Sequence, residues 1–304
     1  MSQSEAGNQT LTQAGMSDSR DTLVSPGRLS PRVLVPKILK WAVLAFFLFI
    51  TLFPIIWLFL QTMKTNAEFM LNPLALPSGF HWQNYVDAVQ ISGLPRMFMN
   101  SMLVSGGSTA INMLICSMGA FVFAREKFKG QNVIVTIILS GVLVPIIAFM
   151  VPYYMIIRDL GLFDTLIGLA IVYTAINIPI STFLLQGFMK SIPFELEEAG
   201  VIDGCTFWQR YWRIVLPLSK IGIVTAGTFV FLFSWNEFIY ALLLTASFTT
   251  RTLQLGIRDF TGQFYTNYTG MYAAIILTII PSIAVYVFFH EKIISGLTAG
   301  ALKT

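Results

Sequence analysis

The sequence predicts an all-α integral membrane protein with six transmembrane helices. Hydrophobic residues make up 55% of the 304 residues and charged residues only 11%, whereas soluble domains contain roughly 25% charged residues. The chain also contains six apolar stretches, each long enough for a helix that crosses about 30 Å of hydrocarbon. Too little charge remains to cover a soluble fold of this length.

The six expected spans lie near residues 41–61, 101–124, 133–157, 166–188, 221–245 and 271–289. Most of them contain proline, which a helix bundle tolerates where neighbouring helices or water satisfy the freed carbonyl groups. The second span contains Ser105, Gly106, Gly107 and Ser108, and small residues of this kind suit close packing of helices.

The distribution of basic residues predicts the orientation. Fourteen of the 19 Lys and Arg residues precede the first span or follow the second, fourth and sixth spans. Because such residues accumulate on the cytosolic side, we expect a multi-pass protein of the cell membrane with both termini in the cytosol. The basic residues form no patch interleaved with aromatics in a soluble domain, so nucleic acid is not an expected partner.

Two regions are expected along the chain. Residues 1–36 should form a disordered cytosolic tail, since the first thirty or so are rich in Ser, Gln, Asn, Thr and Gly. They lack the short apolar core of a cleavable signal peptide. Residues 37–304 should form the transmembrane domain, with a cytosolic loop at about 189–217 and a cytosolic C-terminal tail at about 290–304.

The chain lacks the motifs of the common catalytic and metal sites. It contains no G-x-x-x-x-G-K-[ST], H-E-x-x-H or G-x-S-x-G sequence. The only histidines are His81 and His290, and two cysteines, Cys116 and Cys205, are too few for a Cys-based metal site. We therefore expect no metal, no bound cofactor and no catalytic residue in this chain.

Two other classes of membrane protein would each require sequence features that can be looked for in this chain. A membrane-embedded enzyme would need clustered His, Asp or Glu within the spans, and these are missing. A self-contained secondary transporter would show inverted repeats or ion-coupling charges at the bilayer midplane, and neither is visible in the sequence.

The loop at 189–217 begins with a short expected helix. Ser191 to Pro193 resembles a helix start with proline in the first turn, and Gly204 ends the segment. A helix of about ten residues is unstable alone in water, so packing must hold it. Its N-terminal end, where the helix dipole favours anions, carries Glu195, Glu197 and Glu198.

Glu198 lies in an apolar stripe of this helix, formed by Phe194, Val201 and Ile202. If a partner protein buries the stripe, the carboxylate needs a cation or hydrogen-bond donors. Ala199 and Gly200 leave the adjacent surface small, and glycine inside a helix costs about 1 kcal/mol relative to alanine, which indicates close approach by another backbone. An amphipathic helix lying on lipid is the equal alternative.

A second short helix is expected to follow, because Thr206 and Gln209 fit a capping box. The aromatic residues Phe207, Trp208, Tyr211 and Trp212 alternate here with Arg210 and Arg213. Aromatic and basic side chains of this kind gather at membrane surfaces. The segment is therefore interpreted as an interfacial anchor that leads into the fifth span.

Four segments together resemble a known family. The run Glu198-Ala199-Gly200, with Asp203-Gly204 and Leu216-Pro217, resembles the EAA loop of bacterial ABC-importer permeases. Three further segments narrow the resemblance to the MalG-type permeases of carbohydrate importers related to the maltose transporter. They are Asn100-Ser101 with Phe123-Ala124-Arg125 at the two ends of the second span, the run from Ser234 to Phe238, and the C-terminal run from Gly296 to Lys303.

The resemblance covers nearly all residues from about Leu39 to Lys303 and has three departures. Gly200 stands where a second alanine is usual, and Cys205 stands where a small alanine is usual. Thr304 follows Lys303 where glycine would be usual. The first two residues are small, so close packing is expected to survive.

The resemblance implies a type I importer permease bundle whose 189–217 loop carries a coupling helix. That helix would sit in a cleft of an ATP-hydrolysing partner, where Glu198 would pair with a basic residue. Gly204 would permit the sharp turn and Asp203 would fix it. The implied ATPase-coupling set is Glu197, Glu198, Ala199, Gly200, Asp203 and Gly204.

The implied partners are an ABC ATPase dimer, which binds the ATP and Mg, a second MalF-like permease and an extracytoplasmic solute-binding protein. This chain would form half of the translocation pathway for a sugar or oligosaccharide. The alternative is the same machinery for another solute, such as a polyol or glycerol phosphate. The loop at 248–270 is implied to face the binding protein.

Two further sets of residues are candidates. The C-terminal residues Gly296, Thr298, Gly300 and Lys303 are implied to contact the ATPase, and on the residues alone an unstructured end is equally open. Glu237 is the only acidic residue inside the six spans, and such residues are usually functional or internally paired. With Asn236 it could line the pathway, but a structural hydrogen-bonding role is favoured.

Overall fold

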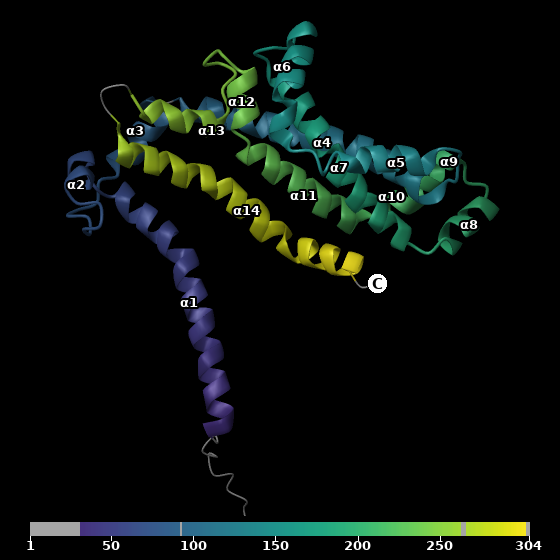
Figure 1. Cartoon of the computed structure of the whole chain (residues 1–304), viewed down its shortest axis with the longest axis horizontal. Coiled ribbons are helices and arrows are strands. Elements are labelled where there is room, and N and C mark those ends of the chain that lie inside the picture. Colours follow the sequence, from purple (N-terminus) through teal and green to yellow (C-terminus); the bar gives the residue numbers. More distant parts are fainter. Residues whose placement is uncertain (1–30, 92, 263–265, 302–304) are drawn as a thin grey trace, which may run out of the picture. The chain divides into compact units, whose positions relative to one another are not determined.

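The computed structural model describes residues 31–91, 93–262 and 266–301, and for residues 31–36, 91 and 295–301 it describes the backbone alone. Within these residues the fold is helical, and the extended residues pair only in an isolated bridge between Thr261 and Thr266 (Figure 1). The all-α prediction is therefore confirmed. The chain divides into two compact units, Met1–Pro54 and Ile55–Thr304.

The described part of the first unit is the beginning of α1, a helix of 32 residues that spans Pro31–Thr62. Its segment Lys37–Thr62 has a mean hydropathy of 2.7 and is long enough to cross a membrane. This segment contains the expected first span. Because α1 begins at Pro31, it starts inside the expected tail of residues 1–36, and the rest of that tail lies outside the described residues.

Two short helices of the second unit connect α1 to the next long helix. α2 spans Asn66–Leu71 and begins with a capping box formed by Thr65 and Glu68. α3 spans Gln83–Ile91. The Asn84 Nδ2 donates hydrogen bonds to the carbonyl groups of Thr62 and Lys64, so α3 is held against the end of α1.

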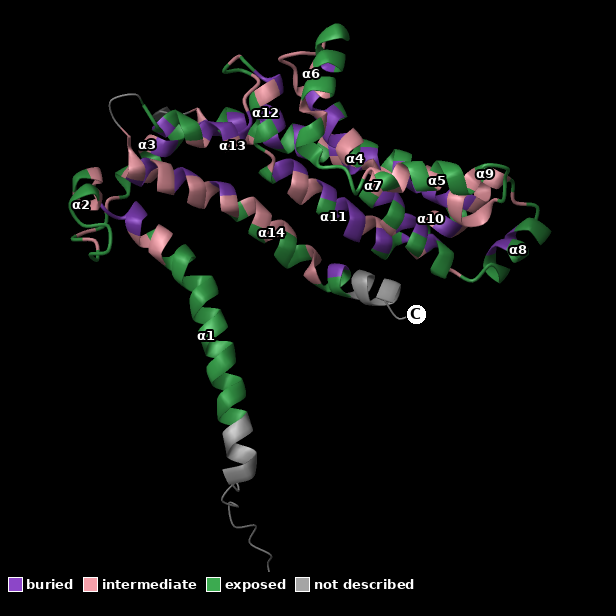
Figure 2. Cartoon of the chain, in the orientation of Figure 1, coloured by how far each residue is buried: buried purple, intermediate pink, exposed green. Residues whose placement is uncertain are grey.

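Four long helices form the core of the second unit. They are α4 (Leu94–Arg125), α7 (Leu166–Ser191), α11 (Lys220–Asn236) and α14 (Tyr268–Ala301). α4 packs against α7 and α11, and α11 also packs against α14 (Figure 1). Buried residues gather where these helices meet (Figure 2). The four long helices contain the second, fourth and sixth expected spans and the first part of the fifth.

Small polar residues mediate the contact of α4 with its neighbours. Ser108 Oγ donates to Ser234 Oγ of α11 at 3.1 Å, and Asn112 Nδ2 donates to the Thr174 carbonyl of α7 at 2.9 Å. A Cβ added at Gly106 or Gly107 would meet nothing within 4 Å in this chain. The close packing expected from this sequence therefore comes from the serines, while the two glycines face open space.

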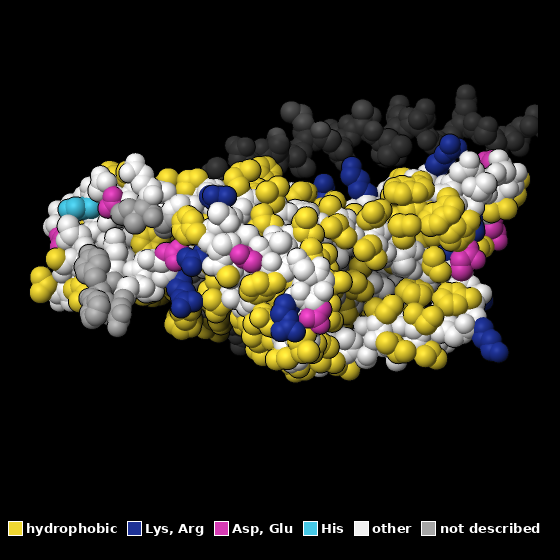
Figure 3. Space-filling model, turned by 90° about the horizontal axis from the view of Figure 1, so that it is seen from above, with side chains coloured by type: hydrophobic (Ala, Val, Ile, Leu, Met, Phe, Trp, Pro, Cys, Tyr) yellow, Lys and Arg dark blue, Asp and Glu magenta, His cyan; other side chains and the backbone are white. Residues whose placement is uncertain are grey.

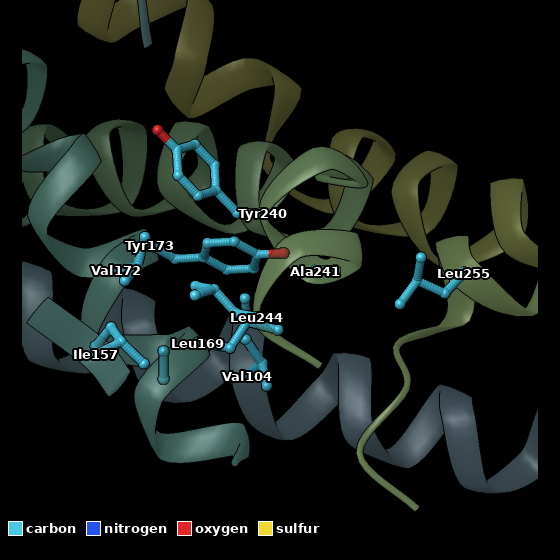
Figure 4. Packing of buried hydrophobic residues seen from close by; sticks show 10 residues of the cluster. Val104, Ile157, Leu169, Val172, Tyr173, Tyr240, Ala241, Leu244 and Leu255 are labelled. Carbon is cyan, nitrogen blue, oxygen red and sulfur yellow. The ribbon is translucent and has the colours of Figure 1, made fainter. Parts of the chain in front are cut away.

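A hydrophobic cluster that contains two tyrosines, Tyr173 and Tyr240, is formed by residues of α4 and α7 together with residues 157, 240–244 and 255 (Figure 4). It includes Leu169 and Val172 of α7 and Val104 of α4, each at most 1% exposed. Aromatic rings bury large areas, so this cluster is a main packing centre of the unit.

The expected third span is not one helix. It is divided into α5 (Gln131–Ser140), the short helix η1 (Ile146–Phe149) and α6 (Met150–Asp159). The residue before a proline is disfavoured in helical conformation, and the break ends at Pro145. A Cβ at Gly141 would lie 2.8 Å from Cγ of Pro179, so glycine permits the close approach of α7 at this point.

The expected fifth span is also divided. α11 ends at Asn236, Glu237 is extended, and α12 spans Ile239–Leu244. Of the described helices, four are long and apolar enough to cross a membrane. A fifth is reached if Phe207–Leu218 and Lys220–Asn236, which meet at 76°, count as one span.

The remaining short elements connect the long helices. Between α7 and α11 lie α8 (Glu195–Ile202), α9 (Phe207–Gln209), the π-helical turn η2 (Arg210–Val215) and α10 (Leu216–Leu218). Between α12 and α14 lie α13 (Leu253–Gly256) and η3 (Ile257–Phe260).

Candidate coupling site

Helix α8 is shorter than predicted, with eight residues from Glu195 to Ile202. The preceding α7 continues through Ser191, so Ser191 belongs to α7 and does not start α8. Ile192 is extended, as expected for a residue that precedes proline. The backbone N–H groups of Glu197 and Glu198 then donate to the Phe194 carbonyl at 2.9 and 3.1 Å, which forms the first turn.

The end of α8 is a Schellman motif. Gly204 has a φ of 85°, which favours glycine. The Cys205 N–H donates to the Gly200 carbonyl and the Gly204 N–H donates to the Val201 carbonyl, the two bonds that define this motif. Backbone bonds therefore fix the turn, and within the described part of the chain the exposed Asp203 side chain forms no hydrogen bond.

Glu197 is buried inside the chain. Its Oε1 lies 2.6 Å from Arg125 Nε, and its Oε2 lies 3.6 Å from Arg210 Nη1. The side chains of Glu197, Arg125 and Arg210 are 0%, 5% and 16% exposed. Burial raises the pKa of Glu197, and the two guanidinium groups act against this rise. The Glu197 carboxylate is therefore paired with two arginines of the same chain.

The two arginines extend the contacts to other elements. Arg125, the last residue of α4, donates from Nη2 to the Ile192 carbonyl at 3.0 Å. Arg210 of η2 donates from Nη2 to Glu126 Oε1 at 2.9 Å. We call Arg125, Glu126, Glu197 and Arg210 the charge cluster. It joins the end of α4, the end of α7, α8 and η2.

Glu198 has the opposite surroundings. It is exposed and forms no ion pair with any described residue. Ile202, one turn further along α8, is 85% exposed, and Ala199 is exposed as well. Hydrophobic and acidic side chains lie next to one another at the end of the second unit that holds α8 (Figure 3, right). The remaining exposed apolar residues of this surface are Phe194, Leu196 and Val201.

Gly200 faces into the chain. It is buried, and a Cβ at this position would come within 2.4 Å of Ile214 Cδ1 and 3.8 Å of Cys205 Sγ. Glycine therefore makes room for the Ile214 side chain of η2. The close approach that the sequence predicted is real, but a side chain of the same protein makes it.

The segment after α8, formed by α9 and η2, was predicted to be an interfacial anchor, but it also packs against α4. The capping box of Thr206 and Gln209 is present, and Trp208 and Trp212 are exposed. Tyr211, however, is fully buried against Phe121, and its hydroxyl lies 2.8 Å from Ser117 Oγ of α4. Sequence reasoning missed this contact, although the four-residue spacing of Phe207, Tyr211 and Val215 indicates one buried face.

Near its N-terminal end, α4 holds the loop between α12 and α13, residues 245–252. Asn100 Nδ2 donates to the carbonyl groups of Thr249 at 2.9 Å and Arg251 at 2.8 Å. The Leu253 N–H donates to Ser101 Oγ at 2.8 Å. Asn100 and Ser101 were singled out in the sequence only through a resemblance, and the structure gives them this contact.

Asp164 holds the same loop from the start of α7. Its carboxylate accepts hydrogen bonds from the Ala246 N–H at 2.8 Å, the Ser247 hydroxyl at 2.6 Å and the Thr250 hydroxyl at 2.5 Å. Burial opposes ionisation here, yet these bonds hold the pKa of Asp164 well below its usual range. Its φ of 58° is unusual for a residue other than glycine. Sequence reasoning did not single out Asp164, because a lone loop aspartate carries no signal.

Glu237 lies in the break between α11 and α12. Its carboxylate accepts hydrogen bonds from the Tyr173 hydroxyl at 2.7 Å and from the N–H groups of Tyr240 and Ala241 at 2.9 and 3.1 Å. It therefore caps the first turn of α12. Asn236 is exposed, and its Nδ2 donates to the Leu232 carbonyl at 2.8 Å.

Comparison with known proteins identifies the family. Residues 111–298 match the model of the family described as binding-protein-dependent transport system inner membrane component. The chain belongs to this family. It is thus a membrane-embedded permease, and the family resemblance read from the EAA-like loop is confirmed.

Curated relatives of this permease carry names of sugar transport systems. The sulfoquinovosyl glycerol transport system permease protein SmoH of Agrobacterium fabrum is 35% identical over 253 residues, 83% of this chain and 89% of that protein. The trehalose transport system permease protein SugB of Mycobacterium tuberculosis is 32% identical over 254 residues, 83% of this chain and 92% of that protein.

A solved structure has the same fold as this permease. It is the crystal structure of a bacterial ABC transporter involved in the import of the acidic polysaccharide alginate. The match has a TM-score of 0.76 and 23% sequence identity, and it covers 86% of this chain and 98% of the other. The expected type I permease fold is confirmed.

The C-terminal candidates of the permease lie at the end of α14. Its backbone is helical through Ala301, so Gly296, Thr298 and Gly300 lie in a helix and not in an unstructured tail. Their side chains, and Lys303 as a whole, lie outside the described residues. 

A polar pocket of about 450 Å³ lies beside the 245–252 loop of the permease. It is lined by residues that include Thr245, Arg251, Leu255 and Arg258. Arg251 Nη1 forms an ion pair with Asp259 Oδ1 at 2.9 Å. Among the described residues, no group of three His, Cys, Asp or Glu side chains could hold a metal ion.

Proposed function

We propose that this permease is one of two membrane subunits of an ABC importer for a sugar or oligosaccharide, and that α8 docks onto the ATP-hydrolysing subunit. The observation that carries the proposal is the contrast on α8. Glu197 is buried and paired with Arg125, whereas Glu198 is exposed among apolar side chains. An exposed carboxylate inside an apolar surface suits a partner that supplies both an apolar cleft and a cation.

ATP binding and hydrolysis would occur in the partner, which would also hold the Mg. Closure of an ATPase dimer would displace α8, and the bundle would alternate between inward-open and outward-open states. This chain would contribute half of the pathway and no catalytic residue. The relatives named for sulfoquinovosyl glycerol and trehalose transport support a glycosidic solute.

The remaining partners follow from the same assignment. A second, MalF-like permease would complete the pathway, and an extracytoplasmic binding protein would deliver the solute to the side that holds the 245–252 loop. The end with α8 and both termini would face the cytosol, as the distribution of Lys and Arg predicts. The C-terminal run from Gly296 to Lys303 would contact the ATPase.

Site-directed crosslinking tests the docking. In a background with Cys116→Ala and Cys205→Ala, a photocrosslinker on Ile202→Cys should attach to an ABC ATPase in membranes that contain the assembled transporter. Adding Glu198→Ala should abolish the crosslink and ATP-dependent uptake, because the carboxylate supplies the charged contact. Adding Glu195→Ala, which removes the same charge from the same helix, should leave both unchanged. Crosslinks to lipid alone would contradict the proposal and favour a helix that lies on headgroups.

A further inference from the structure

The segment from α9 to α10 runs across the direction of the long helix that follows it. Phe207–Leu218 meets Lys220–Asn236, the helix α11, at 76°. Transmembrane helices tilt by only about 20° on average, so this bend places the segment closer to the membrane plane than to the membrane normal. It lies at the end of the second unit that also holds α8 (Figure 1). Amphipathic segments in this orientation lie among lipid headgroups.

The segment presents two tryptophans to its surroundings. Trp208 and Trp212 are 51% and 50% exposed, and their rings lie beside Tyr211, with centroids 6.2 and 4.8 Å from the Tyr211 centroid. Because Tyr211 is buried against α4, it supports both indole rings. Neither indole N–H donates to any described residue. Tryptophans with an apolar ring and a free N–H are enriched at membrane interfaces.

The π-helical turn η2 gives each side of the segment a different neighbour. Tyr211 and Val215 are buried in the cluster with α4. Ile214 lies against Gly200 of α8. Arg213 remains exposed. Turns of this kind are rare in α-helical segments and lie frequently at functional sites.

The exposed charge of this segment is positive. Arg213 and Lys220 are exposed, and neither forms an ion pair with a described residue. The third basic residue, Arg210, belongs to the charge cluster. The sequence contains no acidic residue between Asp203 and Glu237. Two unpaired cations beside exposed aromatic rings complement the negative headgroups of a cytosolic leaflet.

Helix α8, which precedes this segment, carries the opposite charge. Glu195 and Glu198 of α8 and the adjacent Asp203 are exposed. A negative membrane surface repels these carboxylates and attracts Arg213 and Lys220. The two halves of the 189–217 loop therefore favour different partners, a protein for α8 and lipid for the segment that follows it.

We propose that Trp208, Trp212, Arg213 and Lys220 form a binding surface for the headgroup of an anionic phospholipid in the cytosolic leaflet. The guanidinium group of Arg213 would donate to the phosphate, since this group suits paired hydrogen bonds to phosphate oxygens. An interfacial anchor needs only the aromatic rings, whereas this surface selects the charge of the headgroup. The assignment to the cytosolic leaflet rests on the proposed function, which places α8 in the cytosol.

Quenching by brominated phospholipids tests this surface in the assembled transporter. The permease carries Cys116→Ala, Cys205→Ala and a bimane label on Leu218→Cys, a position that is 52% exposed. It is reconstituted with its ATPase and second permease in nanodiscs of equal parts phosphatidylglycerol and phosphatidylcholine. Only one of the two lipids is brominated in each preparation. The ratio of the two quenching efficiencies then reports which headgroup collects at the segment.

Brominated phosphatidylglycerol should quench the parent protein more strongly than brominated phosphatidylcholine. Arg213→Gln should lower the relative affinity for phosphatidylglycerol about five-fold, the effect of one basic residue near an anionic surface. Arg213→Lys should retain most of the preference, because it retains the charge. Lys129→Gln, which removes an exposed charge from the loop between α4 and α5, should behave as the parent.

A change of salt gives the same test without a substitution. Raising the ionic strength from about 0.1 M to about 1 M shortens the Debye length from about 10 Å to about 3 Å. The preference for phosphatidylglycerol should therefore weaken in the parent protein. A preference that does not change with salt would contradict selection by exposed charges.

Three further results overturn the inference. Equal quenching by both lipids in the parent would mean that the surface does not select charge, and quenching by neither would mean that a protein subunit covers it. An equal loss of preference in Lys129→Gln and Arg213→Gln would mean that the attraction is not local. Failure of the proposed function would differ from all three. A bimane on Val201→Cys of α8, which is 53% exposed, should be quenched by neither lipid, and quenching there would place α8 on headgroups whatever the label at Leu218 reports.

Discussion

Glu197 and Glu198 are neighbours in sequence, yet the structure gives them opposite surroundings. Successive residues of an α-helix point about 100° apart, so Glu197 meets Arg125 and Arg210 while Glu198 is exposed. The apolar stripe around Glu198 could be predicted, because it depends on spacing within one helix. The partners of Glu197 could not, because Arg125 and Arg210 belong to elements whose packing the sequence does not encode locally.

Glu197→Ala is expected to destabilise the folded permease much more than Glu198→Ala. Removal of Glu197 leaves Arg125 buried without its carboxylate, and breaking a buried pair in this way typically costs about 3–5 kcal/mol. Substitutions of exposed residues usually change stability by less than about 0.5 kcal/mol. Thermal unfolding in detergent, followed by size-exclusion chromatography, measures the difference as a lower midpoint for Glu197→Ala.

Glu195→Ala is the matched control for this comparison, since Glu195 lies on the same helix and is exposed. Its midpoint should equal that of Glu198→Ala. Equal midpoints for Glu197→Ala and Glu198→Ala would mean that Glu197 is solvated, and the charge cluster would not exist in solution.

At the scale of elements, apolar composition located the spans but did not reveal where two of them break. The 133–157 stretch divides at Gly141 to Pro145 and the 221–245 stretch at Glu237. Proline and glycine marked the first break, but prolines also lie within unbroken helices, as Pro179 does in α7 and Pro281 in α14. Whether proline ends a helix depends on the neighbours that satisfy the freed carbonyl group.

Glu237→Gln is expected to loosen α12 without changing the choice of solute. The carboxylate accepts from the Tyr173 hydroxyl and from two N–H groups of α12, and an amide has only one acceptor oxygen for these donors. Loss of a helix cap costs about 1 kcal/mol. Thermal unfolding should show a modestly lower midpoint, and competition between sugars in an uptake assay should show the parent's order of preference.

Asn236→Ala is the control for that experiment, because Asn236 is exposed and bonds only within its own helix among the described residues. Its midpoint should remain close to that of the parent. A changed sugar preference in Glu237→Gln would assign Glu237 to the solute pathway and reverse the structural interpretation.

At the scale of the whole molecule, the described contacts separate a packed bundle from the surfaces that would meet other subunits. Buried polar residues such as Asn112 and Ser108 hold α4, α7 and α11 together, whereas α8 presents its outer face to solvent. The membrane class and the EAA-like loop were predictable, since they depend on composition and short motifs. The contacts of Asn100, Tyr211 and Asp164 were not, because each joins segments far apart in the chain.

Removal of residues 297–304 is expected to leave the bundle folded and to weaken its association with the ATPase. The buried residues of α14 that the structure describes, such as Ala273, Ala274 and Thr278, precede this segment and are kept in the truncated chain. The backbone of α14 is nevertheless helical through Ala301, so the proposed contact with the ATPase would be made by a helix. Purification of the tagged truncated chain should recover less ATPase at an unchanged unfolding midpoint, while removal of Thr304 alone should recover the full amount. A lowered midpoint would instead place the C-terminal turns within the permease's own fold.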